Sequence, residues 1–188
     1  ILNVTPDSFS DGGEFLSVND AIAQYKKLKK EGAAIIDVGG ESTRPGSKTV
    51  PAKKELQRIM PVIDQIKSNS KNSLVSVDTR KSKVMKAVMK YNIDFVNDVS
   101  GLRYDSRAIS FLNNAKIPFI IMHSISNPAN MQNSIKYKDV LLDVYDFLEK
   151  QIKKCKSKGI SENKIIIDPG IGFGKTLKQN LTLMKKIS

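Results

Sequence analysis

One layout recurs along this chain: an apolar run ends at a polar residue, a loop follows, and a helix-like segment begins. It is clearest at 164–176, where a β-branched run stops at Asp168 and a turn of Pro and Gly follows. Four other places repeat it. Continuous apolar strands that alternate with helices predict a parallel sheet covered by helices.

Hydrophobic periodicity and the Gly, Pro and Asn breakers give the expected bounds of each element. Strands are expected at 1–4, 33–38, 73–77, 94–96, 117–122 and 164–168. Helices are expected at 18–30, 53–68, 82–91, 106–114, 137–158 and 177–187. The first strand is expected to begin before Ile1, because the chain opens inside an apolar run with no initiator Met.

The strand ends recur about every 33 residues, and eight such units make the roughly 250 residues of a (β/α)8 barrel. We therefore expect an α/β fold, a (β/α)8 TIM barrel with about six of its eight βα units present, and one domain over 1–188. An open doubly wound sheet is the rival fold. The barrel is favoured because every strand end carries polar residues, and a barrel gathers all its strand ends around one mouth.

Composition excludes several classes of protein. The formal net charge is +12, but the lysines are spread over many segments, which favours a solvated surface over a nucleic-acid partner. No run approaches the ~18 apolar residues of a membrane span. Cys155, the only cysteine, excludes an internal disulfide and is expected at a helix surface or boundary. Without a signal peptide, a cytoplasmic location is expected.

The glycines after Asp168 suggest a phosphate-binding P-loop at first. That motif needs a Gly five residues before Gly174, where Pro169 stands, so the spacing rejects it. The glycines can instead let the backbone approach a flat ligand, with Phe173 as an apolar wall.

Asp78, Asn97 and Asp168 each end a different strand. One such residue alone would be read as a helix cap or turn residue. Three at equivalent positions favour a binding site. Two carboxylates and an amide can pair with a fused heterocycle that carries ring N–H and amino groups.

Other strand ends and loops offer weaker candidates. His123, the only histidine, ends the fifth strand, where a binding role and a purely structural one are equally plausible. Asn3 ends the first strand and could ligate a hard cation through its carbonyl oxygen. Arg44, beside Thr43 in a Gly/Pro loop, suits a phosphate or carboxylate. Met122 is a candidate apolar wall, although its default role is core packing.

Six motifs in order resemble dihydropteroate synthase, and they cover essentially the whole chain. They are 3–13 (NVTPDSFSDGG), 37–46 (DVGGESTRPG), 77–80 (VDTR), 97–101 (NDVSG), 122–123 (MH) and 168–175 (DPGIGFGK). The resemblance implies a TIM-barrel transferase of folate biosynthesis. Such an enzyme joins 6-hydroxymethyl-7,8-dihydropterin pyrophosphate to 4-aminobenzoate and releases pyrophosphate and 7,8-dihydropteroate, with Mg²⁺.

The resemblance also implies roles for individual residues. In the family, pyrophosphate is thought to leave first, and the aniline nitrogen then attacks the pterin cation. The implied pterin-binding and catalytic residues are Asp78, Asn97 and Asp168, with Val99, Met122, Gly172 and Phe173 around the ring. Asn3 is the implied Mg²⁺ and pyrophosphate ligand. The mobile loops over aminobenzoate, which sulfonamides mimic, contain Phe9, Thr43, Arg44 and Pro45.

The chain lacks two motifs of the resembled family. A Ser-Arg-Lys-type motif ends the family's seventh strand and an Arg-x-His its eighth, and this chain stops at Ser188 before either. We therefore expect a fragment that is inactive alone, from a parent that is a homodimer. The alternatives are a methyltetrahydrofolate methyltransferase domain, disfavoured by the loop at 43–46, and a basic nucleic-acid-binding module.

Overall fold

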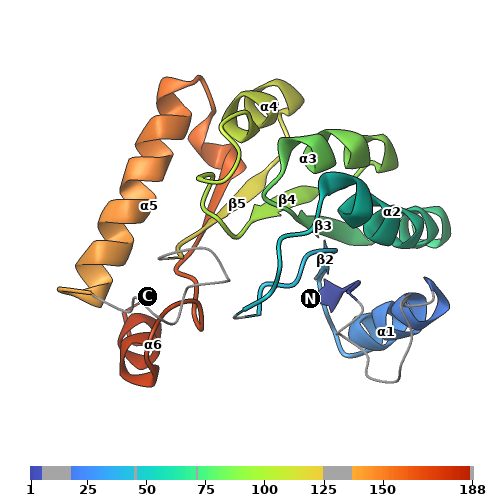
Figure 1. The fold of residues 1–188 in the computed structure, drawn as a ribbon, viewed down its shortest axis with the longest axis horizontal. Coiled ribbons are helices and arrows are strands. Elements are labelled where there is room, and N and C mark those ends of the chain that lie inside the picture. Colours follow the sequence, from blue (N-terminus) through green and yellow to red (C-terminus); the bar gives the residue numbers. More distant parts are fainter. Residues whose placement is uncertain (6–17, 45, 71, 125–136, 187–188) are drawn as a thin grey trace. The chain divides into compact units, whose positions relative to one another are not determined.

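The computed structural model describes residues 1–5, 18–44, 46–70, 72–124 and 137–186. They form two compact units: residues 1–42 with 49–97, and residues 43–48 with 98–188. Strands and helices alternate through both units, as the sequence predicts (Figure 1).

The first unit contains β1 (Leu2–Asn3), β2 (Ile35–Gly39), β3 (Leu74–Asp78) and most of β4 (Phe95–Asp98). These strands pair in parallel and in chain order. A doubly wound sheet would instead reverse its strand order at a switch point. The sequential order therefore rejects the rival fold and agrees with barrel topology.

Three helices connect these strands. They are α1 (Val18–Lys30), α2 (Ala52–Asn69) and α3 (Ser82–Val88), which continues as a 3₁₀ turn at Met89–Tyr91. Apolar residues on one face of each helix are buried, as at Ile59 and Ile63 of α2. Pro61, the weak point in the predicted helix, lies inside α2 and does not end it.

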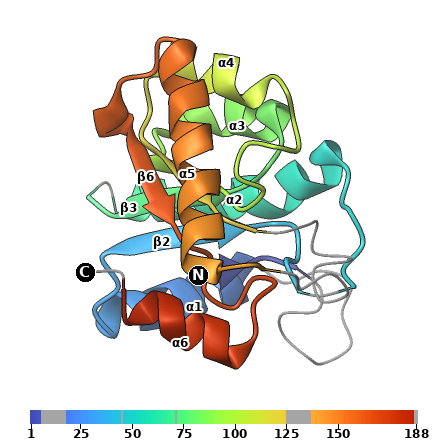
Figure 2. The same cartoon turned by 90° about the vertical axis from the view of Figure 1, so that its left-hand side faces the viewer.

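The second unit contains α4 (Ala108–Ala115), β5 (Phe119–Met122), α5 (Val140–Ser157), β6 (Ile165–Asp168) and α6 (Leu177–Met184). Strands β5 and β6 pair in parallel, and Figure 2 shows α5 running beside β6. Asp139 caps α5 by accepting the backbone N–H groups of Leu141 and Leu142. β6 is less buried than a continuous apolar run predicts, since Ile166 and Ile167 are exposed.

Two sequence expectations differ from the structure. The helix expected to reach residue 187 ends at Met184 among the described residues. Cys155 is fully buried in α5, so its expected place at a helix surface or boundary is wrong. Burial raises the pKa of this thiol to about 11 despite the nearby Lys154 charge, so it is a core residue.

Candidate functional site

The strand register aligns the polar ends of the first unit. Asn3 pairs with Gly39, Gly39 with Asp78, and Asp78 with Asn97. Neighbouring parallel strands lie about 4.8 Å apart. The structure therefore brings three predicted site residues, Asn3, Asp78 and Asn97, into one row at the carboxyl ends of the strands.

Asp37, inside β2, is a site residue that the sequence reasoning did not single out. Its Oδ2 accepts a 2.9 Å hydrogen bond from Asn97 Nδ2. Because a carboxylate only accepts, this bond identifies the amide nitrogen of Asn97. The signal in the sequence was an acid that interrupts the apolar run of β2.

Two buried oxygens in this pair have no hydrogen-bond partner among the described residues: Asp37 Oδ1 and Asn97 Oδ1. A buried acceptor without a donor costs about 1–3 kcal/mol, so native proteins retain one for a reason such as a missing ligand. The pair therefore presents two acceptors suited to N–H donors that the chain itself does not provide.

The oxygens beside Gly39 fit a hard cation. Both Asn3 Oδ1 and Asp78 Oδ2 lie next to Gly39. A Cβ built on that glycine would stand 3.5 Å from the Asn3 oxygen and 3.4 Å from the Asp78 oxygen. Asn3 is exposed, and carboxamide and carboxylate oxygens are ligands that Mg²⁺ takes one or two at a time. No group of three or more His, Cys, Asp or Glu side chains that could hold a metal occurs among the described residues.

The loop after β2 is tied together at its two ends. Glu41 Oε1 accepts the Val50 backbone N–H at 2.8 Å, and Arg80 Nη2 donates to Thr49 Oγ1 at 3.3 Å. Between these ends, Thr43 is half-buried and Arg44 exposed. Two predicted site residues, Pro45 and Phe9, lie outside the described residues.

A network of four charged residues stabilises the contact between the two ends of this loop. Glu41 Oε2 lies 2.8 Å from Arg80 Nε and 2.9 Å from Lys81 Nζ. Lys81 Nζ also lies 2.5 Å from Oε2 of Glu55, whose side chain is 0% exposed. Gly40 permits this packing, because a Cβ there would stand 2.8 Å from Cγ2 of Ile59.

The two carboxylates of the network are held differently. Burial alone would raise the pKa of Glu41, but Arg80, the Val50 N–H and Lys81 together lower it. Burial raises the pKa of Glu55, and its bonds to Lys81 and Thr79 only partly oppose this. Glu41 is therefore the firmly ionised member.

In the second unit, Met122 pairs with Asp168 across β5 and β6. Asp168 Oδ1 accepts the Gly170 backbone N–H at 2.7 Å, and Phe173 N donates to Gly170 O at 3.0 Å. The predicted acid and its aromatic neighbour thus belong to one hydrogen-bonded turn.

Glycine is required in that turn at Gly170. Its φ is +67°, and a Cβ there would collide with the His123 carbonyl oxygen. The exposed Gly172, at φ +85°, has open space around it. Val99, the remaining predicted wall, is half-buried just after β4.

Lys175, the last residue of the motif at 168–175, is the second residue to which the sequence analysis assigned no role. It is 8% exposed. Its Nζ lies 2.8 Å from Gly170 O, 3.1 Å from Phe173 O and 3.1 Å from His123 Nδ1. Its burial could not be predicted from local sequence, because a lysine in a glycine-rich loop is ordinarily exposed.

His123 is buried and neutral. Its ring meets Phe147 edge-on, with centroids 4.9 Å apart, and Arg103 donates to the neighbouring Ser124 carbonyl. Burial, with the positive charges of Lys175 and Arg103, lowers the pKa of His123 to about 4. His123 is thus an uncharged ring that packs inside the second unit.

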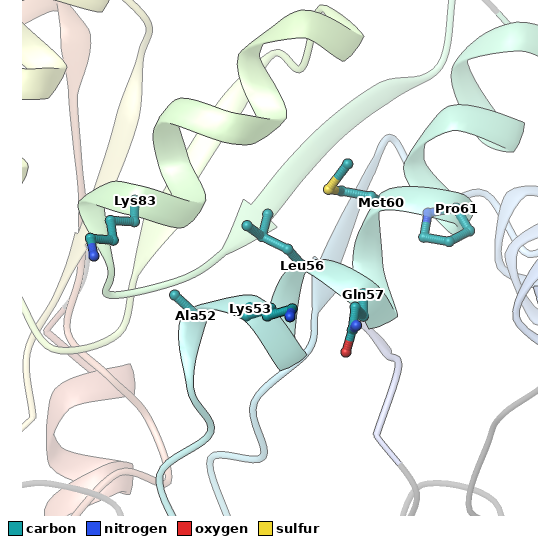
Figure 3. Close-up of a pocket in the computed structure, with 7 residues that line it drawn as sticks. All are labelled: Ala52, Lys53, Leu56, Gln57, Met60, Pro61 and Lys83. Carbon is teal, nitrogen blue, oxygen red and sulfur yellow. The ribbon is translucent and has the colours of Figure 1, made fainter.

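A groove of about 770 Å³ lies apart from these residues (Figure 3). It is bounded by α2 and the start of α3, and no strand-end residue contributes to it. Its lining residues are Ala52, Lys53, Leu56, Gln57, Met60, Pro61 and Lys83. The groove is therefore not the candidate site.

No helix among the described residues has the length and hydropathy to cross a membrane.

Comparison with known proteins identifies the family. The family model for pterin binding enzymes matches residues 1–188. The dihydropteroate synthase of Synechocystis sp. is 42% identical over 187 residues, which is 100% of this chain and 64% of that protein. The chain thus spans just under two thirds of that relative's length.

Two solved structures agree. Dihydropteroate synthase from Yersinia pestis, in complex with a sulfonamide drug, has a TM-score of 0.91 at 37% identity, covering 99% of this chain and 67% of that one. The Xanthomonas albilineans enzyme in complex with 7,8-dihydropteroate has a TM-score of 0.83 at 35% identity, covering 99% and 64%. These likenesses confirm an α/β fold made of about six βα units of a TIM barrel. The chain belongs to the dihydropteroate synthases of the pterin-binding enzyme family.

Proposed function

We propose that the protein synthesises 7,8-dihydropteroate from 6-hydroxymethyl-7,8-dihydropterin pyrophosphate and 4-aminobenzoate. The observation that carries this proposal is the pair of buried oxygens without donors, Asp37 Oδ1 and Asn97 Oδ1. A pterin carries ring N–H and amino groups that would satisfy them. The Xanthomonas relative, in complex with 7,8-dihydropteroate, supports this ligand class.

The carboxylates would hold and stabilise the pterin. Asp78 and Asp168 end β3 and β6, and each can accept from an N–H group of the ring. In the reaction, the bond between the exocyclic carbon and the pyrophosphate oxygen breaks, and the electron pair leaves with pyrophosphate. The resulting cationic pterin is stabilised by fixed negative charge nearby.

The second step joins the two substrates. The amino nitrogen of 4-aminobenzoate attacks the exocyclic carbon, a C–N bond forms, and the nitrogen releases one proton to water. Thr43 and Arg44, in the loop closed by Glu41, are proposed to contact the aminobenzoate carboxylate or the departing anion, for which a guanidinium fork is suited.

Mg²⁺ is part of the proposal. Asn3 and Asp78 would hold the ion at the ends of β1 and β3, where their oxygens flank Gly39. Once bound, Mg²⁺ would offset the charge of the leaving pyrophosphate. The homodimer and the cytoplasmic location stay predictions.

The test is an assay of the full-length protein with both substrates, following 7,8-dihydropteroate. Asp78→Asn and Asp168→Asn should each lower kcat/KM at least about 100-fold, the effect of removing one group that stabilises transition-state charge. Asp64→Asn, an exposed acid on α2, is the matched control and should stay within twofold of wild type. Full activity in both site variants would overturn the assignment.

The alternative functions have less support. A methyltransferase would need a corrinoid donor and no aminobenzoate, so the same assay separates it. A nucleic-acid-binding module would show salt-dependent DNA or RNA affinity without competition from pterin.

A further inference from the structure

Lys175 carries a charge that no carboxylate neutralises directly. None of the ion pairs among the described residues includes it. Its acceptors are instead two carbonyl oxygens of the turn after β6, on Gly170 and Phe173, and the ring nitrogen Nδ1 of His123. A buried ammonium is costly unless all its donors are used, and here three N–H groups meet three good acceptors.

This arrangement sets the tautomer of His123. A protonated amine can only donate, so Nδ1 must be the unprotonated ring nitrogen. The proton of the neutral ring therefore sits on Nε2. The His123 carbonyl oxygen, 3.4 Å from Lys175 Nζ, is a weaker fourth contact on the same strand end.

These contacts reach the predicted pterin ligand Asp168 through a single residue, Gly170. Gly170 O accepts from Lys175, while the Gly170 N–H donates to Asp168 Oδ1. Phe173 is held on both sides, because its N–H bonds to Gly170 and its carbonyl bonds to Lys175. The turn thus occupies one oxygen of the Asp168 carboxylate. This bond sets the direction in which the other oxygen points.

We propose that Lys175 is a positioning residue of the pterin site, whose ammonium group fixes the turn after β6 to the end of β5 and so aims the Asp168 carboxylate and the Phe173 ring. The inference rests on the proposed function, because the ligand for which these groups are positioned is a pterin. It assigns no contact between Lys175 and substrate.

The charge of this group should be lost in mild alkali. Burial lowers the pKa of Lys175 to about 8, while the Asp168 charge opposes the shift. The other groups that face the cluster are His123 itself, Arg103 after β4 and Asp143 in α5, which act on the His123 ring. Above about pH 8 the neutral amine has two N–H groups for three acceptors, so the turn should loosen.

The first experiment measures the tautomer directly in the wild-type protein, without substrate. Nitrogen-15 NMR of histidine side chains in the full-length protein distinguishes a protonated Nε2 from a protonated Nδ1, and His123→Phe identifies the resonances of His123. We expect a proton on Nε2 and none on Nδ1 at pH 7. A proton on Nδ1 would overturn the proposed role of Lys175.

The second experiment measures 6-hydroxymethylpterin binding by calorimetry between pH 6.5 and 9.5. Lys175→Met should raise the Kd at least about tenfold, the loss expected from one charged hydrogen bond, and should remove the rise in Kd that wild type shows above pH 8. Lys178→Met, which removes an exposed lysine of α6, is the matched control and should bind as wild type does.

The outcomes separate the two proposals. A wild-type protein that does not bind the pterin contradicts the proposed function and this inference with it. A wild type that binds, together with a Lys175→Met variant within twofold of it at every pH, contradicts the positioning role alone. If Lys175→Met does not fold, the tautomer and the pH dependence of wild-type binding still decide.

Discussion

The ion network behind the β2–α2 loop gives the sharpest prediction about how the site is held in shape. Glu41 joins two cations, Arg80 and Lys81, to the backbone of Val50. Glu41→Gln keeps the size of the side chain and can keep the Val50 bond, but it removes the charge. Glu55, which pairs with Lys81, would then be the one carboxylate left in the network, so one positive charge would be in excess.

The magnitude follows from burial. The side chains of Arg80, Lys81 and Glu41 are 6%, 9% and 12% exposed, so this is a buried network and not a surface pair. Removing one partner from a buried ion pair costs about 3–5 kcal/mol. Because Gln keeps one hydrogen bond, we expect Glu41→Gln to lower the free energy of unfolding by about 3 kcal/mol.

A double-mutant cycle separates charge balance from simple loss of contacts. Arg80→Gln alone should cost about 2 kcal/mol, since Lys81 still pairs with Glu41. The double variant restores neutrality, with Lys81 and Glu55 left as a pair. Its loss should therefore be smaller than the sum of the single losses by at least about 1 kcal/mol.

The assay is urea unfolding of the full-length protein at pH 7, with steady-state kinetics on the same samples. If Glu41 holds the loop closed, the KM for 4-aminobenzoate should rise about tenfold in Glu41→Gln, while the Kd for the pterin stays within about twofold. The reasoning is refuted if the two single-variant losses in the free energy of unfolding add to within about 0.5 kcal/mol of the double-variant loss and the KM for 4-aminobenzoate is unchanged.

Two further predictions concern the second unit. Gly170→Ala should destabilise the protein by at least about 2 kcal/mol and weaken pterin binding, because the added Cβ meets the His123 carbonyl at a positive φ; thermal unfolding and calorimetry check it, with Gly172→Ala, which has the strained φ but open space, as the comparison. His123 should make the protein acid-sensitive: its folded pKa of about 4 lies below the ordinary 6.5, so the unfolded chain binds more protons between these values. The free energy of unfolding should then fall by up to about 3 kcal/mol from pH 6.5 to 4. Urea titrations of wild type and His123→Gln should differ in slope across that window, and equal slopes would contradict it.

Much of this fold could be predicted from local sequence. Among the described residues, apolar runs and breakers located each strand and α-helix to within about three residues, because those signals depend on neighbours in the chain. The strand-end positions of Asp78, Asn97 and Asp168 followed from the same signals, since each closes an apolar run. The roles of these residues remain predictions.

What could not be predicted depends on contacts between distant segments. Asp37 meets Asn97 across 60 residues, and Glu41 meets Lys81 across 40. No local pattern encodes such pairs. Cys155 was placed wrongly for a related reason: flanking lysines suggested a surface, but the helix turns that one position into the core.

Two lysines are buried in the part of the chain that the structure describes, and they show how a lysine-rich chain uses charge inside its fold. Lys81 is held by two carboxylates, so its ammonium sits in a network where charges cancel. Lys175 is held by neutral acceptors, so its charge is offset only at a distance by Asp168. Lys175 yields its proton near pH 8, and it lies beside the acid proposed to grip the pterin, so the turn after β6 should be the part of the site most sensitive to mild alkali.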